Sequence, residues 1–451
     1  MNLANASMIS RLLAPRFTPM AAILLALLST PAPARAERAF DACLGPLRAE
    51  ALARGIAAET FDRHTRDLVP DRSVLEALDY QPEFKTPIWD YLAALVDEER
   101  IADGRAMLER WRGELAEVER RYGVDPFTVV AVWGVESDFG RAFGHRPLVT
   151  SLATLSCFGR RQPYFRGEFI SALRILQDGH IAPEQLVGSW AGAFGHTQFM
   201  PSTFLATAVD FDGDGRRDLV GSVPDALAST ANFLKRAGWR RAEPWGFEVR
   251  LPAGFDASVA GRRNRRPLSD WIARGVRPVA PAQGEKLRAA RQTGFVPSPE
   301  RPQDRSAPSP PPVAVEEAWG GPPLPPDTRA AVLLPAGRDG PSFLVFRNFD
   351  AIYGYNAAES YALAIAHLAD RLRGGGPFAA AWPTDDPGLS RAERRELQTL
   401  LIARGHDIGE VDGRIGERSR VAIKAEERRL GRVESGRAGL ALLRALRSGG
   451  G

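Results

Sequence analysis

The chain has 451 residues, which is long enough for two or three domains. Its formal net charge is +4, and this falls to +1 when the three arginines of an N-terminal signal are removed, so the charge implies no nucleic-acid partner.

The N-terminus has the pattern of a secretory signal. Two arginines precede an apolar stretch at residues 20–28, and Ala-Arg-Ala at residues 34–36 is typical of a cleavage site. The apolar run is too short to span a bilayer, and no cysteine lies directly after the cleavage site to carry a lipid. We therefore expect residues 1–36 to be a cleaved signal peptide and the mature chain to be soluble in the periplasm, with no stable membrane anchor.

The mature part contains two cysteines, Cys43 and Cys157. In an oxidising compartment such a pair favours a disulfide, which would join the N-terminal helical region to the domain that follows. A catalytic thiol is the alternative, but no histidine lies in a motif that would partner it.

Residues 40–246 have helical spacing with glycine-rich connections. Asp125 and Pro126 are typical of an N-cap and a first-turn proline, and the apolar run that follows predicts a buried helix ended by Gly140. Glu136 falls in the last turn, where burial and the helix dipole both disfavour its charged form and raise its pKa. Such an acid can protonate a glycosidic oxygen. The alternative is a surface or capping glutamate.

An ordinary glycosidase pairs its acid with a second carboxylate. The nearest candidate, Asp138, lies two positions from Glu136 and so points to a different helix face. The sequence offers no obvious partner.

An acidic run at residues 210–218 reads DFDGDGRRD. It places Asp210, Asp212, Asp214 and Asp218 at positions one, three, five and nine of an EF-hand-like loop, although Gly221 replaces the closing glutamate. Oxygen ligands without histidine or cysteine favour calcium over zinc, and the ion would be structural. The alternative is a metal-free loop that caps a helix.

From Phe247 the pattern changes to strand-like alternation. Residues 296–327 are so rich in proline that we expect a mobile loop, and the basic cluster GRRNRR at residues 261–266 is expected to be a solvated loop. Residues 343–371 return to helical spacing, so the region between is an insertion within the helical domain. A stretch rich in glycine and proline follows and predicts a linker.

Six segments together resemble the lytic murein transglycosylase B family, which is glycoside hydrolase family 103 of the lysozyme-like superfamily. The resemblance covers residues 40–371 and includes GVESDFGR (134–141), SLATLS (151–156), GSWAGAFGHTQFMPSTF (188–204), DFDGDGRRDL (210–219), ANFLKRAGW (231–239) and NFDAIYGYNAAESYALAIAHLADRL (348–372). The C-terminal residues resemble a peptidoglycan-binding type 1 domain, through Leu397-Gln398, Gly405, Asp412-Gly413 and Gly416.

The resemblance implies cleavage of the β-1,4 bond between N-acetylmuramic acid and N-acetylglucosamine in peptidoglycan glycan strands. One glutamate would protonate the leaving oxygen and then, as a carboxylate, deprotonate the sugar's own 6-hydroxyl, which closes a 1,6-anhydro ring without a catalytic cofactor. A glutamate that acts first as the acid and then as the base requires a pKa near the working pH. The alternatives are a hydrolytic muramidase on the same fold and a non-catalytic wall-binding protein.

Carried over residue by residue, the resemblance makes Glu136 catalytic and Asp225 the acid that closes the calcium loop. It also implies substrate-binding roles for Ser189, Gln198, Phe199, Met200, Phe233, Tyr355 and Asn356. Phe199 and Met200 have core packing as an alternative, and His196 is equally compatible with a structural role. Gly354 and Phe233 depart from residues often seen in the family, a basic residue and a tyrosine.

The expected fold is mainly α (α+β). Its parts are a lysozyme-like catalytic domain at residues 37–372 with a small β-containing insertion at about 247–342, a linker at 373–387, and a three-helix wall-binding module at 388–446. A wall-binding module tethered to a wall-cleaving domain raises the local concentration of substrate.

Overall fold

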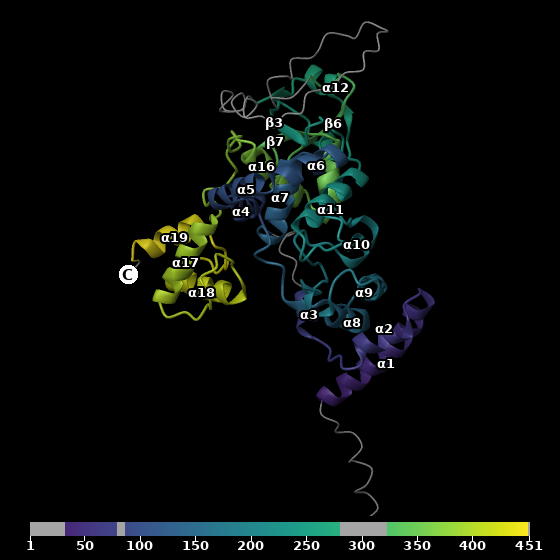
Figure 1. Ribbon diagram of the computed structural model, residues 1–451. Helices are drawn as coiled ribbons and strands as arrows, with labels where there is room; N and C mark the ends of the chain where they lie inside the picture. The colour runs from purple at the N-terminus through teal and green to yellow at the C-terminus, as the bar shows by residue number, and fades with distance from the viewer. Residues whose placement is uncertain (1–31, 79–85, 280–322, 450–451) are drawn as a thin grey trace, which may run out of the picture.

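The computed structural model describes residues 32–78, 86–279 and 323–449. Its fold is mainly α with a small antiparallel sheet, which confirms the expected fold class. Figure 1 shows a lower helical part around α8 and α9, a central helical part around α7 and α16, a sheet above them, and the C-terminal helices at one side. The expected signal peptide and proline-rich loop lie largely outside the described residues.

The lower helical part has a core rich in phenylalanine, in which Phe165, Phe169 and Phe194 are fully buried. A disulfide between Cys43 and Cys157 joins its first helix to α8, as the sequence predicted. Its helices are α1 (Ala32–Ala53), α2 (Ala58–Thr65), α3 (Ser73–Leu78), α8 (Leu148–Phe158), α9 (Gln162–Gln177) and α10 (Pro201–Thr207), with the short strands β1 (Arg146–Pro147) and β2 (Val187–Gly188) and the 3-10 turn η2 (Pro183–Gln185) beside them.

The central part surrounds α7 (Pro126–Ser137). Its other helices are α4 (Ile88–Leu95), α5 (Glu98–Arg110), α6 (Arg112–Tyr122), α11 (Val223–Arg236), α15 (Arg347–Asn356) and α16 (Glu359–Leu372). Asp125 caps α7 by accepting a hydrogen bond from the backbone N–H of Thr128, and Pro126 occupies the first turn. Because α7 packs against α5, α11 and α16, nearly all of its apolar side chains are buried, as expected for a helix without a polar face.

The end of α7 differs from the sequence expectation. The helix ends at Ser137 and not at Gly140, because Asp138 and Phe139 both adopt left-handed backbone angles, with φ of 53° and 57°. This reversal folds the Phe139 ring back over Gly134, where an added Cβ would lie only 2.7 Å from the ring. A glycine at position 134 is therefore required for this turn to form.

The inserted region forms a five-stranded antiparallel sheet in the order β4-β6-β7-β3-β5. Its elements are β3 (Gly246–Arg250), η3 (Ala257–Val259), β4 (Arg266–Pro267), α12 (Leu268–Ala273), β5 (Arg277–Pro278), β6 (Arg329–Leu333) and β7 (Ser342–Val345). The expected helical spacing from residue 343 is wrong at its start, because residues 343–345 form a strand buried on both faces between β3 and β6. The sheet rests on α15, where Arg262 and Arg265 of the basic cluster form ion pairs with Asp350 instead of being solvated.

The C-terminal module has three helices, α17 (Arg391–Ala403), α18 (Glu417–Arg429) and α19 (Leu440–Arg447), around a small leucine-rich core. The segment before it is packed against the central part, since the Phe378 ring stacks on His367 with centroids 3.9 Å apart. Among the described residues, no helix has the length and apolar character needed to cross a bilayer.

Candidate functional site

Glu136 lies partly buried in the last turn of α7, on the side that faces α16. The hydroxyl of Tyr361, on α16, donates a hydrogen bond to Oε1 of Glu136. Burial raises the pKa of Glu136 to about 7, and the hydrogen bond from Tyr361 acts in the opposite direction because it favours the carboxylate. At neutral pH both protonation states of Glu136 are therefore populated, so that the same side chain can give and take a proton.

Four aromatic rings extend from Glu136 toward the glycine-rich loop at residues 188–200. The rings of Tyr361 and Tyr355 are stacked with centroids 6.2 Å apart, and Phe233 lies 4.8 Å from Tyr355. Phe199 contacts both Phe233 and Tyr355. The structure thus brings together three of the residues that the sequence assigned to substrate, from α11, α15 and the loop, beside the proposed acid.

Phe199, Phe233 and Tyr355 differ in how far they are buried. Phe199 is 1% exposed and belongs to the lower core, so its ring supports the site from beneath and has no open face for a sugar. Phe233 and Tyr355 remain partly exposed, and the hydroxyl of Tyr355 donates to the carbonyl of Thr197. The core interpretation therefore fits Phe199, whereas Phe233 and Tyr355 keep surface that a ligand can contact.

The polar residues of the glycine-rich loop hold the loop itself together. Ser189 Oγ accepts from the backbone N–H of Ala193, and the side-chain amide of Gln198 donates to the carbonyls of Phe143 and Gly195. Met200 is the partly buried N-cap residue of α10, and Asn356 is exposed at the end of α15.

His196 ties the loop to α7. Its Nδ1 accepts a hydrogen bond from Nε1 of Trp133, and its carbonyl accepts from Ser137 Oγ. Burial lowers the pKa of His196 to about 4, so the ring is neutral at neutral pH and has a structural role here.

No second carboxylate assists Glu136 within the part of the chain that the structure describes. The pKa of Glu136 is set by burial and by Tyr361, with no contribution from another acid. The side chain of Asp138 points to another face, as expected from its spacing, and is bound by arginines.

Tyr361 is a site residue that the sequence reasoning missed. It lies within a run of alanines and leucines on a helix whose buried face is almost wholly apolar. A tyrosine in such a position needs a partner for its hydroxyl, and this need was the available signal.

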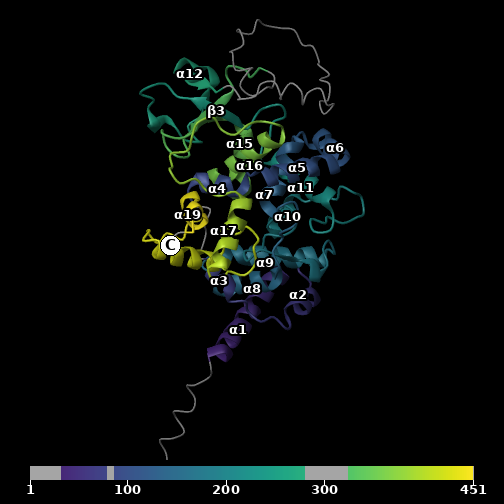
Figure 2. The ribbon, with the colours of Figure 1, turned by 90° about the vertical axis from the view of Figure 1, so that its left-hand side faces the viewer.

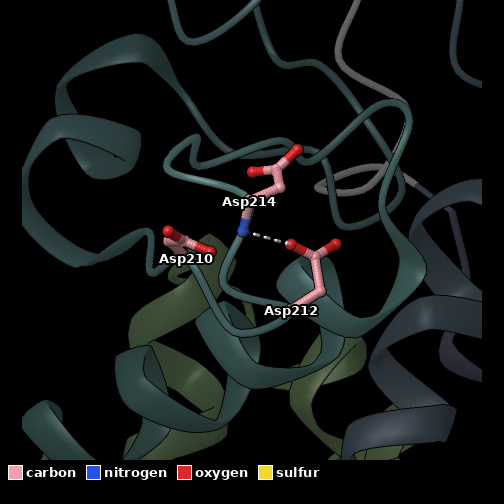
Figure 3. A group of neighbouring side chains, drawn as sticks. All are labelled: Asp210, Asp212 and Asp214. Atoms are coloured by element: carbon pink, nitrogen blue, oxygen red, sulfur yellow. Dashed lines mark hydrogen bonds between the residues drawn. The ribbon is translucent and has the colours of Figure 1, made fainter.

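The acidic loop brings three of its aspartates together (Figure 3). Carboxylate oxygens of Asp210, Asp212 and Asp214 lie within 4.8 Å of one another. Two backbone N–H groups donate to Asp210 and fold the loop around it, those of Gly213 and Gly215. Clustered carboxylate oxygens at this separation suit a hard divalent cation.

Asp218 and Asp225 do not join this group, contrary to the sequence expectation. Asp225 is fully buried, and its carboxylate accepts from the backbone N–H groups of Phe211, Asp212 and Asp218. Asp218 likewise accepts from the backbone of Val220 and Gly221. Their oxygens are used to satisfy buried backbone donors of the loop.

A family model described as the transglycosylase SLT domain matches residues 39–307 and 312–370, well over half of the chain. The chain belongs to this family. A second model, described as a putative peptidoglycan binding domain, matches residues 390–446 of this SLT family member.

Relatives of this SLT family member include the membrane-bound lytic murein transglycosylase B of Escherichia coli (strain K12), which is 34% identical over 215 residues. That match covers 46% of this chain and 57% of the relative, so the chain spans little more than half the length of this curated relative.

Among solved structures, SltB3 from Pseudomonas aeruginosa in complex with NAG-anhNAM-pentapeptide is 44% identical with a TM-score of 0.65. The match covers 90% of this chain and 99% of that one. Slt35 from Escherichia coli, in complex with calcium, is 25% identical with a TM-score of 0.56 and covers 73% of this chain and 92% of its own.

Replacing Tyr361 with phenylalanine removes the hydrogen bond that favours the Glu136 carboxylate, so we expect the pKa of Glu136 to rise above about 7. The measurement is a ¹³C NMR titration of glutamate carboxyl groups, with the Glu136 signal assigned by its loss in Glu136→Gln. Tyr353→Phe is the matched control, because Tyr353 lies on α15 against Arg262. An unchanged titration midpoint in Tyr361→Phe would mean that this hydrogen bond does not tune the acid.

Proposed function

We propose that the chain is a lytic transglycosylase that cleaves the β-1,4 bond between N-acetylmuramic acid and N-acetylglucosamine in peptidoglycan. The observation that carries the proposal is a single partly buried glutamate, Glu136, whose pKa is raised to about 7 with no second carboxylate acting on it. Family membership supports the proposal, as does the anhydro sugar bound to SltB3.

In the proposed reaction, protonated Glu136 donates its proton to the glycosidic oxygen as the bond to the muramic acid C1 breaks. The resulting carboxylate then removes the proton of the 6-hydroxyl of the same sugar, whose oxygen bonds to C1 and closes the 1,6-anhydro ring. Glu136 regains its proton, and no water is consumed. The pKa of about 7 suits both steps, because neither protonation state is strongly disfavoured at neutral pH.

The hydroxyl of Tyr361 has a defined part in this scheme. Its hydrogen bond holds one carboxyl oxygen of Glu136, Oε1, and leaves the other oxygen for the substrate. The bond also stabilises the carboxylate that forms when the proton leaves. Tyr361 thereby orients the acid and moderates the effect of burial on its pKa.

Two other functions fit the same fold. A hydrolytic muramidase would need a group that activates water on the far side of the sugar, and a second carboxylate usually has that role. A non-catalytic wall-binding protein would have no need of an acid with a raised pKa.

Glu136→Gln keeps the size and hydrogen-bonding shape of the side chain but cannot donate the proton. We expect turnover of purified peptidoglycan to fall by at least about 100-fold, the usual contribution of a general acid. Glu119→Gln is the matched control, because burial also raises the pKa of Glu119 but this residue lies on α6.

Mass spectrometry of the products from the wild-type protein separates the three functions. Muropeptides that are one water lighter than hydrolysis products support the transglycosylase. Muropeptides with a free reducing end indicate the muramidase, and intact sacculi with both the wild type and Glu136→Gln indicate the binding protein.

The C-terminal module is proposed to bind peptidoglycan, which agrees with the family model that it matches. With a substrate in the cell wall, we infer that the protein acts in the periplasm after removal of residues 1–36. The proposed domains are residues 37–372 for cleavage and residues 388–446 for wall binding.

We also propose that the acidic loop binds a structural calcium ion through Asp210, Asp212 and Asp214. Their clustered oxygens support this, and so does calcium in the related Slt35. The ion would hold the loop between α10 and α11, close to the end of the glycine-rich segment, and would supply no proton.

The calcium proposal is tested by thermal unfolding in calcium, in magnesium and in a chelator. An ion whose free concentration is 100 times its dissociation constant stabilises the native state by about 2.7 kcal/mol. We therefore expect a higher melting temperature in calcium, lost in a variant with both Asp212→Asn and Asp214→Asn but kept in Asp256→Asn, which neutralises a carboxylate at the N-cap of η3, outside the acidic loop. Equal melting temperatures in calcium and chelator would contradict it.

A further inference from the structure

The C-terminal module is docked on the central helical part through arginine side chains. Arg391, the first residue of α17, reaches Asp138 with a distance of 2.7 Å, and Arg437 reaches Asp90 of α4 with a distance of 2.6 Å. Arg395 of α17 pairs with Glu99 of α5. Figure 2 shows α17 beside these helices. The module is therefore held in place, in contrast to the freely tethered module that a flexible linker would give.

The contact at Asp138 differs from the other two because of its position and its burial. Asp138 also faces Arg141 at 3.5 Å and Arg100 at 3.6 Å, and only Arg391 comes from the module. The side chains of Arg391 and Asp138 are just 12% and 18% exposed. Both side chains are shielded from most of the solvent, so loss of one partner leaves the other charge poorly solvated and without this partner.

Asp138 is part of the turn that directly follows Glu136. Asp138 and Phe139 both have positive φ, a backbone region that is uncommon for residues other than glycine and unfavourable for a bulky one such as Phe139. The turn persists because its neighbours hold it. Ser137 donates to the carbonyl of His196, and the Phe139 ring packs on Trp133 with centroids 5.8 Å apart. The charge of Arg391 is a restraint on this turn that the module supplies.

The backbone at Arg391 is held by the N-terminal cap of α17. Ser390 and Glu393 form a capping box, in which the serine side chain accepts from the backbone of Glu393 and the glutamate accepts from the backbone of Ser390. The arginine therefore extends from an ordered helix end, and less conformational entropy is lost when it pairs with Asp138.

We propose that Arg391 is a positioning residue for Glu136. By holding Asp138, it fixes the turn at the end of α7 and keeps Glu136 aligned with Tyr361. The module thus supports the chemistry in addition to binding the wall. This inference rests on the proposed role of Glu136 as the acid.

The test compares Arg391→Ala, Arg391→Lys and Arg395→Ala in the full-length protein. The substrate is a short soluble peptidoglycan oligosaccharide, whose cleavage does not depend on attachment to the wall. A misplacement of the order of 1 Å can cost up to about 100-fold in rate, so we expect Arg391→Ala to lower kcat by between about 10-fold and 100-fold with little change in KM. Arg391→Lys should recover most of the rate, because the charge remains.

Arg395→Ala removes a docking contact of the same kind without touching the turn, and we expect its kcat to stay near that of the wild type. The pH profile adds a readout that loss of stability would not give. If Glu136 loses its alignment with Tyr361, its pKa rises, and the alkaline limb of the kcat profile moves to higher pH in Arg391→Ala only.

Equal kcat in Arg391→Ala and Arg395→Ala, or an unmoved alkaline limb in Arg391→Ala, would overturn the inference and leave the ion pair a docking contact. This outcome differs from failure of the proposed function, in which Glu136→Gln itself would retain full activity.

Discussion

The proposed chemistry depends on the removal of water from one carboxyl group. Glu136 lies at the end of a helix whose other side chains are almost all apolar, and α16 covers it from the opposite side. Transfer of a carboxylate into such surroundings is unfavourable, which raises the pKa of Glu136 to about 7. The Tyr361 hydroxyl limits this rise, so that the acid remains able to lose its proton.

The rest of the architecture holds this carboxyl group in position. A strained turn ends α7, and His196 and Trp133 join the glycine-rich loop to the same helix. Tyr355 of α15 stacks on Tyr361 and is itself packed against Phe233 of α11. The inserted sheet is anchored on α15 through Asp350, and the module is anchored on the turn itself through Arg391. Segments far apart in the sequence therefore meet around a single acid.

The sequence predicted the elements that depend on local patterns. The cap at Asp125, the apolar run of α7, the disulfide and the clustered carboxylates of Asp210, Asp212 and Asp214 all follow from neighbouring residues or from residue type. Features that depend on tertiary contacts were missed. Tyr361, the partner of Glu136, is 225 residues away in the sequence. Asp225 accepts from backbone groups of the loop, a role that was not predicted because no sequence pattern shows which backbone donors need an acceptor. The strand β7 has the composition of a buried helix segment, and only its pairing with β3 and β6 distinguishes the two.

The pH dependence of kcat/KM for release of anhydro-muropeptides tests the central claim most directly. The first step needs the protonated acid, and the free protein loses that proton as the pH rises through the pKa of Glu136. We expect kcat/KM to fall above a midpoint at about pH 7. A profile whose fall has its midpoint near pH 4.5, the ordinary pKa of a glutamate, would contradict the account, because Glu136 would then be an ordinary solvated carboxylate.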